Sequence, residues 1–277
     1  MKKYFSVVLI TLSIVSCKPP QPANDPSTVV TAVPKKPEPV KITYTLIETL
    51  PHDTTCFTEG LLMYEGKLFE SSGAPDNLPR TRSSFGIVNL KNGKLDVKGE
   101  LDRKTYFGEG IAILNNKLYQ LTYQNQVGFI YDAKTFNSAG QFSFKNKEGW
   151  GLTTDGTSLI MSDGTSDLTF LDPANQNVVK TLNVNTINYD LPDQLNELEY
   201  INGFIYANVW RTNTIIKIDP ATGDISGIMD LTQLAATARS KYKNSLEMNG
   251  IAFDPATKKM LITGKMWPEI YKIEIAF

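Results

Sequence analysis

The 277-residue sequence has only two cysteines and one histidine. Cys17 lies close to the N-terminus, so Cys56 has no partner in the rest of the chain and no internal disulfide can form there. The single histidine, His52, excludes a zinc site built on clustered histidines. Cys56 is expected to be a small core residue. A nucleophilic Cys56 with His52 as its partner is the alternative.

The sequence also lacks an excess of either charge. It has 28 Lys and Arg against 29 Asp and Glu, a net charge of −1, and no run of six like charges. Nucleic-acid binding requires a basic face that displaces counterions, so nucleic acid is not expected as a partner. The hydrophobic fraction of 41% is enough for a sizeable core.

The N-terminal stretch "MKKYFSVVLITLSIVSC" has two lysines, an apolar run and small residues before Cys17. Its apolar run is too short to span a bilayer, and its layout is that of a secretory signal. "IVSC" also resembles a bacterial lipobox, in which the cysteine carries the lipid. We expect a lipoprotein signal peptide over residues 1–17 and an exported protein, anchored by lipid at Cys17 in the bacterial envelope (periplasm or outer membrane). A plain signal peptide with an incidental cysteine is the alternative.

Residues 18–40 carry seven of the fifteen prolines. Proline fixes φ and removes a backbone donor, so such a stretch forms an extended spacer. We therefore expect a proline-rich tether over residues 18–41 and a folded domain over residues 42–277.

The folded domain repeats itself. Each copy has an apolar-alternating strand, a tight polar turn and a second strand, followed by a third strand, another turn and in most copies a fourth strand. The first turns fall at Glu65-Gly66, Asn115-Asn116, Asp155-Gly156 and Asn202-Gly203, and the fifth copy has a longer one. Asn-Gly and Asp-Gly pairs favour two-residue hairpins with positive φ. The five copies begin at Thr58, Gly108, Gly149, Leu195 and Met248.

Four antiparallel strands that recur every 40–50 residues or so indicate a β-propeller. We therefore predict an all-β fold with five blades. The lone strand "VKITYTLIETL" (40–50) is expected to pair with "EIYKIEI" (269–275) and close the ring. Residues 230–247 have helical character. A β-sandwich is the competing architecture.

In a propeller, the first strand of each blade lines the central channel. The repeats place five residues at one equivalent position: Glu59, Glu109, Trp150, Asn196 and Asn249. Two carboxylates brought together raise the pKa of one of them, which makes it a usable proton shuttle near neutral pH. Nearby aromatic residues could wall a pocket, or could simply pack the blades.

Eight motifs, taken in order, resemble the plant and bacterial type of glutaminyl-peptide cyclotransferase (glutamine cyclotransferase). The resemblance runs from about Phe57 to the C-terminus. The motifs are "FTEGL" (57–61), "YFGEGI" (106–111), "EGWGLT" (148–153), "MSDGT" (161–165), "LNELEY" (195–200), "YANVW" (206–210), "NGIAFD" (249–254) and "TGKMWP" (263–268).

This resemblance implies a five-bladed propeller that converts the N-terminal glutamine of peptides or proteins into pyroglutamate and releases ammonia. It places the general base and acid role on Glu109. Phe57, Phe107, Tyr123, Trp150 and Trp210 would wall the pocket, and Asn196, Asn249 and Lys265 would contact the substrate amide or oxyanion. The sequence departs from the family in two places. Glu59 stands where plant enzymes have glutamine, and this second carboxylate could bind the α-ammonium group of the substrate or compete with Glu109 as base. Tyr123 stands where tryptophan is common.

No cofactor is expected, and the enzyme is expected to be a metal-independent monomer. A structural calcium ion held by backbone carbonyls and Asp163 or Glu197 stays open, because calcium needs only oxygen ligands. Two other functions also stay open. One is a surface-anchored propeller that binds peptide or glycan without chemistry, and the other is a metal-dependent, lactonase-like hydrolase.

Overall fold

The structure is a computed structural model, and it describes residues 38–186, 189 and 191–276. The predicted signal peptide, Cys17 and residues 18–37 of the tether therefore lie outside the described residues.

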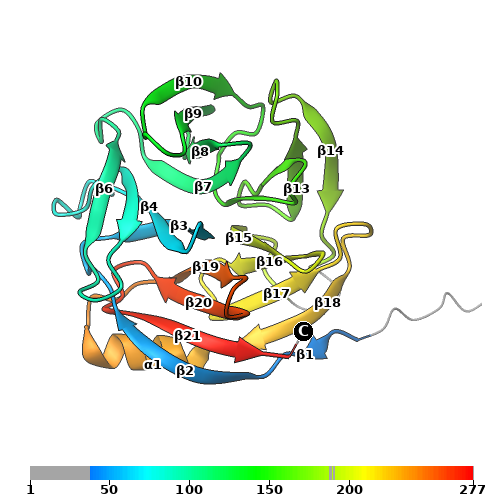
Figure 1. The fold of residues 1–277 in the computed structure, drawn as a ribbon. Coiled ribbons are helices and arrows are strands. Elements are labelled where there is room, and N and C mark those ends of the chain that lie inside the picture. Colours follow the sequence, from blue (N-terminus) through cyan, green and yellow to red (C-terminus); the bar gives the residue numbers. More distant parts are fainter. Residues whose placement is uncertain (1–37, 187–188, 190, 277) are drawn as a thin grey trace, which may run out of the picture. The chain divides into compact units, whose positions relative to one another are not determined.

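The described chain forms five sheets around a central axis, which confirms the five-bladed propeller (Figure 1). Blade one contains β3 (Phe57–Tyr64), β4 (Lys67–Gly73), β5 (Ser84–Val88) and β6 (Leu95–Glu100). Blade two contains β7 (Gly108–Leu114), β8 (Lys117–Thr122), β9 (Val127–Asp132) and β10 (Ser138–Ser143). Blade three contains β11 (Leu152–Thr154), β12 (Leu159–Met161), β13 (Asp167–Leu171) and β14 (Val178–Asn183).

The last two blades show how the ring closes. Blade four contains β15 (Leu195–Ile201), β16 (Phe204–Val209), β17 (Thr214–Ile218) and β18 (Ile225–Asp230). Blade five contains β19 (Met248–Asp254), β20 (Lys259–Gly264) and β21 (Glu269–Ile275), and its outer strand is β2 (Tyr44–Pro51) from the start of the domain. β2 pairs antiparallel with β21, as the sequence predicted.

The first strand among the described residues lies within the last two residues of the predicted tether. Val40 and Lys41, placed at the end of the tether, form β1 (Val40–Lys41). This strand pairs in parallel with β18 and adds a fifth strand to blade four. Proline at position 39 has no backbone N–H to donate, but the two residues after it can join a sheet edge.

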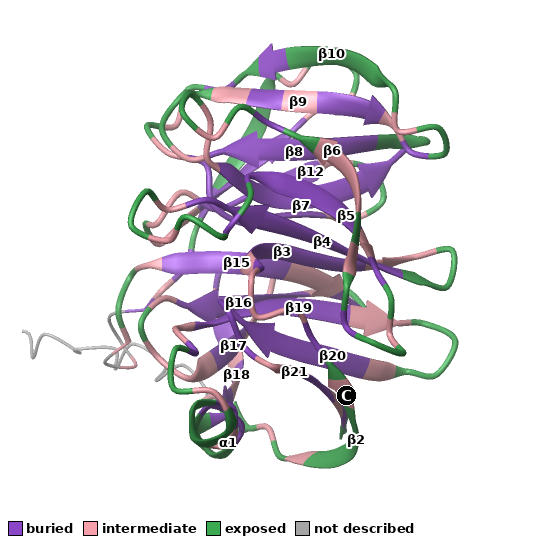
Figure 2. Cartoon of the chain, turned by 90° about the vertical axis from the view of Figure 1, so that its left-hand side faces the viewer, coloured by how far each residue is buried: buried purple, intermediate pink, exposed green. Residues whose placement is uncertain are grey.

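The hydrophobic core lies between neighbouring blades. One cluster, for example, joins Leu121 and Phe142 of blade two to Leu152 and Met161 of blade three. The inner strands are buried, whereas outer strands such as β10 and β2 are mostly exposed (Figure 2). Each blade thus needs its neighbours to bury its faces, which is why the repeats fold as one ring.

The hairpin turns largely follow the prediction. Glu65, Asn115, Asn116 and Asn202 have positive φ, as two-residue hairpin turns require. Asp155-Gly156 is different, because β11 ends at Thr154 and β12 begins only at Leu159. There the Asp155 carboxylate accepts hydrogen bonds from the backbone N–H groups of Thr157 and Ser158, which stabilises a longer turn.

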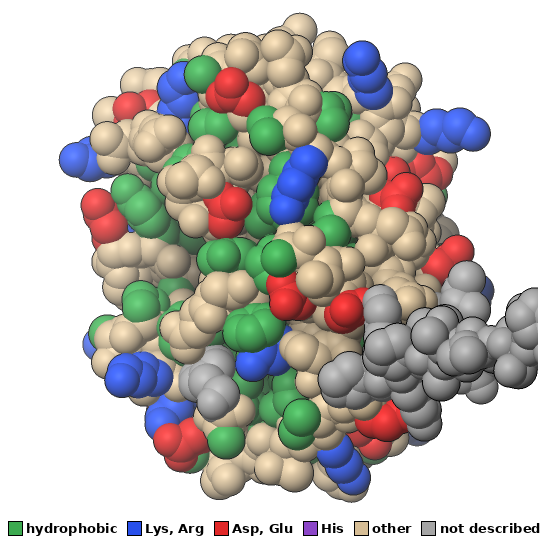
Figure 3. All heavy atoms as spheres, turned by 90° about the vertical axis from the view of Figure 1, so that its right-hand side faces the viewer, with side chains coloured by type: hydrophobic (Ala, Val, Ile, Leu, Met, Phe, Trp, Pro, Cys, Tyr) green, Lys and Arg blue, Asp and Glu red, His purple; other side chains and the backbone are tan. Residues whose placement is uncertain are grey.

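The predicted helix is α1 (Thr232–Lys241), between blades four and five. Its buried residues Leu234, Ala235 and Ala238 pack into the core cluster that also contains Trp267 and Tyr271. Among the described residues, no helix is long and apolar enough to cross a membrane. On the face drawn in Figure 3, basic and acidic side chains are interspersed.

Candidate active site

Four of the five equivalent residues occupy interruptions in the pairing of the inner strands. Thr58 and Gly60 pair with adjacent residues of β4, so Glu59 between them has no partner. The register shifts in the same way around Glu109, Asn196 and Asn249. Such bulges free a residue from the regular alternation and redirect its side chain, and they are common beside active sites.

Glycines follow Glu59, Glu109 and Asn249, because neighbouring inner strands approach closely there. A Cβ on Gly110 would lie 2.4 Å from Leu152 N and 2.6 Å from Trp150 O in the next blade. A Cβ on Gly60 would lie 2.8 Å from Ile111 N. The glycine after Glu109 in "YFGEGI" therefore lets the first strands of adjacent blades pack together while the carboxylate projects from the bulge.

Side chains from all five blades line a cavity of about 270 Å³ at one end of the channel. They come from the beginnings of the inner strands and from the residues that follow the second strands, because both positions lie at the same end of each hairpin. Nine of the ten predicted pocket residues line it. The lining consists of Phe57, Glu59, Pro75, Phe107, Glu109, Tyr123, Trp150, Asn196, Trp210 and Lys265.

Five aromatic rings form a continuous arc around this cavity. Phe57 and Phe107 lie 6.0 Å apart between ring centroids, Phe107 and Tyr123 6.0 Å, Tyr123 and Trp150 6.4 Å, and Trp150 and Trp210 5.4 Å. Edge-to-face and tilted contacts of this kind are favourable. The arc gives the cavity an apolar wall that excludes water from a small bound group.

A polar cluster lies at the Phe57 end of the arc. Lys265 Nζ donates a hydrogen bond to Glu59 Oε1 at 2.7 Å and lies 4.5 Å from the centroid of the Phe57 ring. Asn249 Nδ2 donates to Glu59 Oε2 at 3.1 Å. Burial raises the pKa of Glu59 to about 7, although the Lys265 ammonium opposes this. Glu59 is thus held by protein donors on both oxygens.

Glu109 differs from Glu59 in having no such partners. Its side chain is buried, yet no hydrogen bond from a described residue reaches its carboxyl group. Burial, and then the negative charge of Glu59, raise its pKa well above that of an ordinary glutamate, while Lys265 opposes this. A buried carboxyl group with a raised pKa and free oxygens in a pocket is suited to proton transfer.

The two asparagines are placed differently. Asn196 lines the cavity, and its Oδ1 atom is buried without a hydrogen-bond partner among the described residues. Asn249, predicted to contact the substrate, does not line the cavity. Its Nδ2 also donates to Thr58 O at 3.0 Å, so its amide holds Glu59 in this structure. Its Oδ1 atom, like that of Asn196, is buried without a hydrogen-bond partner among the described residues, and a contact with the substrate stays a prediction.

Sequence reasoning missed Pro75, which lines the cavity from the loop between β4 and β5. This loop has no counterpart of the same length in the other blades, so the repeats gave no signal for it. The Trp150 ring is fixed by a hydrogen bond from Nε1 to Glu148 Oε2 at 2.9 Å. Trp267, also at a repeat position, is fully buried in the core and is not part of the wall.

A second buried cluster contains His52, Cys56 and Glu70, whose ligand atoms lie within 4.8 Å of one another. His52 Nδ1 lies 2.8 Å from the carbonyl oxygen of Trp267, so it donates there. Nε2 lies 3.0 and 3.1 Å from the two Glu70 oxygens. Burial lowers the pKa of His52, but the attraction of Glu70 outweighs it and the net shift is upward. Both ring nitrogens thus lie against oxygen partners, the Trp267 carbonyl and the Glu70 carboxylate, and a metal ion in this cluster would compete with these contacts.

The same surroundings argue against a nucleophilic Cys56. Burial raises the pKa of its thiol well above the ordinary value, and the charge of Glu70 raises it further. A reactive cysteine requires the thiolate, which a lowered pKa would favour. The cluster is therefore a buried, hydrogen-bonded His52–Glu70 pair with a core thiol beside it.

The carboxylates considered for calcium already accept hydrogen bonds. Glu197 on β15 accepts from Leu61 N of β3 at 3.0 Å and from Ile251 N of β19 at 2.8 Å, which ties three inner strands together. Asp163 accepts from Asn146 Nδ2 at 2.8 Å and Thr165 Oγ1 at 2.6 Å. A calcium ion at either residue would compete with these donors.

Comparisons with known proteins agree with this geometry. The glutamine cyclotransferase family model matches residues 20–275. The glutaminyl-peptide cyclotransferase of Arabidopsis thaliana is 37% identical over 235 residues, which cover 83% of this chain and 70% of the relative. The crystal structure of Myxococcus xanthus glutaminyl cyclase matches with a TM-score of 0.74 at 31% identity, over 86% of this chain and 98% of that one.

The family match covers most of the chain, and it coincides with five blades that converge on an aromatic pocket with a free buried carboxyl group. The chain belongs to the glutamine cyclotransferase family.

Proposed function

We propose that the protein is a glutaminyl-peptide cyclotransferase in which Glu109 moves the proton. It converts the N-terminal glutamine of peptides or proteins into pyroglutamate and releases ammonia. The Arabidopsis and Myxococcus relatives carry names for this activity. The observation that supports the assignment of Glu109 is its buried carboxyl group, which lines the pocket with no hydrogen-bond partner among the described residues.

The reaction needs little beyond positioning and proton transfer. The α-nitrogen of the substrate attacks the side-chain amide carbon, forming the new C–N bond, and the bond from that carbon to the amide nitrogen breaks. The α-nitrogen loses one proton and the departing NH₂ group gains one to leave as ammonia. A single carboxylate can accept the first proton and return it. The nucleophile is tethered to its target, so a wall that keeps the chain folded back removes much of the barrier.

The remaining pocket residues have complementary roles in this proposal. The aromatic arc from Phe57 to Trp210 encloses the five-membered ring as it forms. The protons of Lys265 that Glu59 does not accept, together with the Asn196 amide, are available for the oxygen on which negative charge develops. Glu59 holds Lys265 in place, and its charge raises the pKa of Glu109.

A non-catalytic binding propeller would not need a free carboxyl group in the pocket, so this alternative is not favoured. We also propose that the chemistry is metal-independent. In the pocket the carboxylates of Glu59 and Glu109 are accompanied by the Lys265 ammonium, which would repel a metal cation. The protein is proposed to act as a monomer, because all five blades that build the pocket belong to one chain.

Ammonia release from a glutaminyl dipeptide by the purified full-length protein tests the function. We expect release, with equal rates before and after prolonged treatment with a strong chelator. A folded protein that releases no ammonia would refute the proposed function. Release that disappears with chelator and returns with an added metal would refute metal independence only, and would direct attention to His52, Cys56 and Glu70.

We further propose that the protein is exported and lipid-anchored at Cys17 in the bacterial envelope. The lipobox-like "IVSC" and the proline-rich stretch after it support this proposal. The wild-type protein should fractionate with membranes and be released by detergent, whereas Cys17→Ser should lose the anchor. If the two proteins fractionate alike, Cys17 does not carry the anchor.

A further inference from the structure

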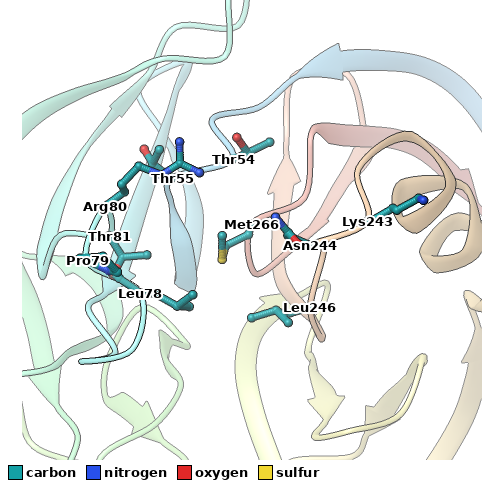
Figure 4. A pocket seen from close by; sticks show the side chains of 10 residues that line it. All are labelled: Thr54, Thr55, Leu78, Pro79, Arg80, Thr81, Lys243, Asn244, Leu246 and Met266. Atoms are coloured by element: carbon teal, nitrogen blue, oxygen red, sulfur yellow. The ribbon is translucent and has the colours of Figure 1, made fainter.

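A second cavity, of about 400 Å³, lies beside the pocket described above. Figure 4 shows it between the loop that joins β4 to β5 and the segment that follows α1, with Met266 between them. A cavity of this size can accept one or two side chains of a bound peptide.

Three chain segments connect this cavity with the pocket of about 270 Å³ in which the glutamine is proposed to cyclise, called the cyclisation pocket from here on. Thr55 lines the cavity and Phe57 lines the pocket. Met266 lines the cavity, and the preceding residue, Lys265, lines the pocket. Met266 N donates to Cys56 O at 2.8 Å, which holds two of these segments together. The third segment is the β4–β5 loop, which supplies Pro75 to the pocket and residues 78–81 to the cavity.

The loop between the two cavities is held in place before any ligand binds. The Arg103 guanidinium donates to three of its carbonyl oxygens, at 3.0 Å to Pro75, 3.2 Å to Pro79 and 3.1 Å to Thr81. The loop also contains internal hydrogen bonds, such as Leu78 N to Pro75 O at 3.0 Å. A fixed wall lowers the entropy cost of binding a peptide against it.

The surface that lines the cavity is mostly apolar, and it includes one cationic side chain that is free to contact a ligand. Leu78, Leu246 and Met266 provide the apolar surface. Arg80 extends past Thr55 at the side of the cavity and makes no hydrogen bond or ion pair with a described residue (Figure 4). By contrast, the neighbouring Arg82 is paired with Glu100. The side chain of Lys243 points away from the centre of the cavity.

We propose that this cavity binds the part of the substrate chain that follows the N-terminal glutamine, and that Arg80 selects an acidic side chain there. The inference rests on the proposed function, because it is the cyclising glutamine that fixes the start of the peptide in the adjacent pocket. An extended peptide advances about 3.3 Å per residue, so the residues just after the glutamine are the ones that can reach a neighbouring cavity. The guanidinium is suited to a carboxylate because it offers donors in a fixed fork.

The test compares peptides that begin with glutamine and carry one glutamate at the second, third, fourth or fifth position, each with a matched peptide that has glutamine there. We expect one position at which the acidic peptide has a kcat/KM about two- to fivefold higher, as for an exposed ion pair. The difference should lie in KM, because this contact does not change during the reaction. It should shrink as salt is added.

Arg80→Gln should reduce this acidic preference to about one, whereas the matched control Arg82→Gln should keep it. A preference that is absent, or that survives in Arg80→Gln, overturns the proposal. A preference lost in Lys104→Gln instead would also overturn it, because Lys104 lines a separate polar groove and not this cavity. Calorimetry of the acidic peptide with the Glu109→Gln variant measures the contact with Arg80 through binding alone, without turnover. The contact would then be detectable even if the proposed reaction fails.

Discussion

Glu109→Gln is expected to lower kcat for a glutaminyl dipeptide by about 10²- to 10⁴-fold, the usual contribution of a positioned general acid or base. The substitution keeps the size of the side chain and removes its ability to accept a proton. The side chain has no hydrogen bond to a described residue, so little structural support is lost with it. Ammonia release under saturating substrate measures the effect.

The control for this prediction is the binding of the same peptide. Calorimetry should show that Glu109→Gln still binds it with an affinity within a few-fold of the wild type, because the aromatic arc is unchanged. Near-wild-type turnover in a folded Glu109→Gln protein would remove Glu109 from the mechanism. Loss of both folding and binding would mean that the residue is structural.

The pH profile gives a second readout of the same carboxyl group. Burial and the Glu59 charge raise the pKa of Glu109, so kcat/KM should rise with pH through a limb well above pH 4.5. In Glu59→Gln the repelling charge is gone, and Lys265, which favours the ionised form of Glu109, stays. The pKa of Glu109 should therefore fall, and the acidic limb should move to lower pH. A limb that stays in place would show that it belongs to another group.

Lys265→Met is expected to lower the free energy of unfolding by about 3–5 kcal/mol at pH 8, because it leaves the buried Glu59 carboxylate without its partner. Lys265 and Glu59 side chains are only 7% and 2% exposed. The double variant Glu59→Gln/Lys265→Met removes both charges and should recover much of the loss. Denaturant unfolding of the two single variants and the double variant gives the coupling between the residues.

The loss should depend on pH in a definite direction. The pKa of Glu59 in the folded protein is about 7, above its ordinary value of 4.5, so the folded state binds the proton more tightly than the unfolded state does. Its contribution to stability is then fullest at low pH and is lost as pH rises through the folded pKa. Without Lys265 the folded pKa rises further, so Lys265→Met should be less destabilised at pH 6 than at pH 8.

The exposed pair Lys272–Glu48 offers a matched control, with its Nζ and Oε2 atoms 3.3 Å apart. Lys272→Met should change the free energy of unfolding by no more than about 1 kcal/mol, because solvent screens such pairs. If Lys265→Met has an equally small effect at pH 8, the Glu59–Lys265 pair does not hold the pocket together.

Much of the fold and of the pocket could be predicted from the internal repeats of the sequence. Local turn chemistry at Glu65-Gly66 and Asn202-Gly203 marked the hairpins, and the hairpins gave the blades. Because a propeller places equivalent residues of successive blades around one axis, the alignment also brought Glu59, Glu109 and Asn196 to one cavity. These features depend on interactions between residues close together in the chain and on the symmetry of the repeats. The sequence specifies both.

The tertiary structure decided the features that depend on contacts between blades. Asn249 occupies the same repeat position as Glu109, yet it lies behind Glu59, because its amide finds the Glu59 carboxylate and the Thr58 carbonyl of blade one. Glu59 and Glu109 occupy equivalent repeat positions, but they differ because only Glu59 accepts a hydrogen bond from Lys265. Pro75 and the second cavity come from a loop without a repeat counterpart. Such contacts join residues far apart in the chain. The repeats therefore specified the positions of Glu59, Glu109 and Asn249, whereas the packing of the ring determined their partners.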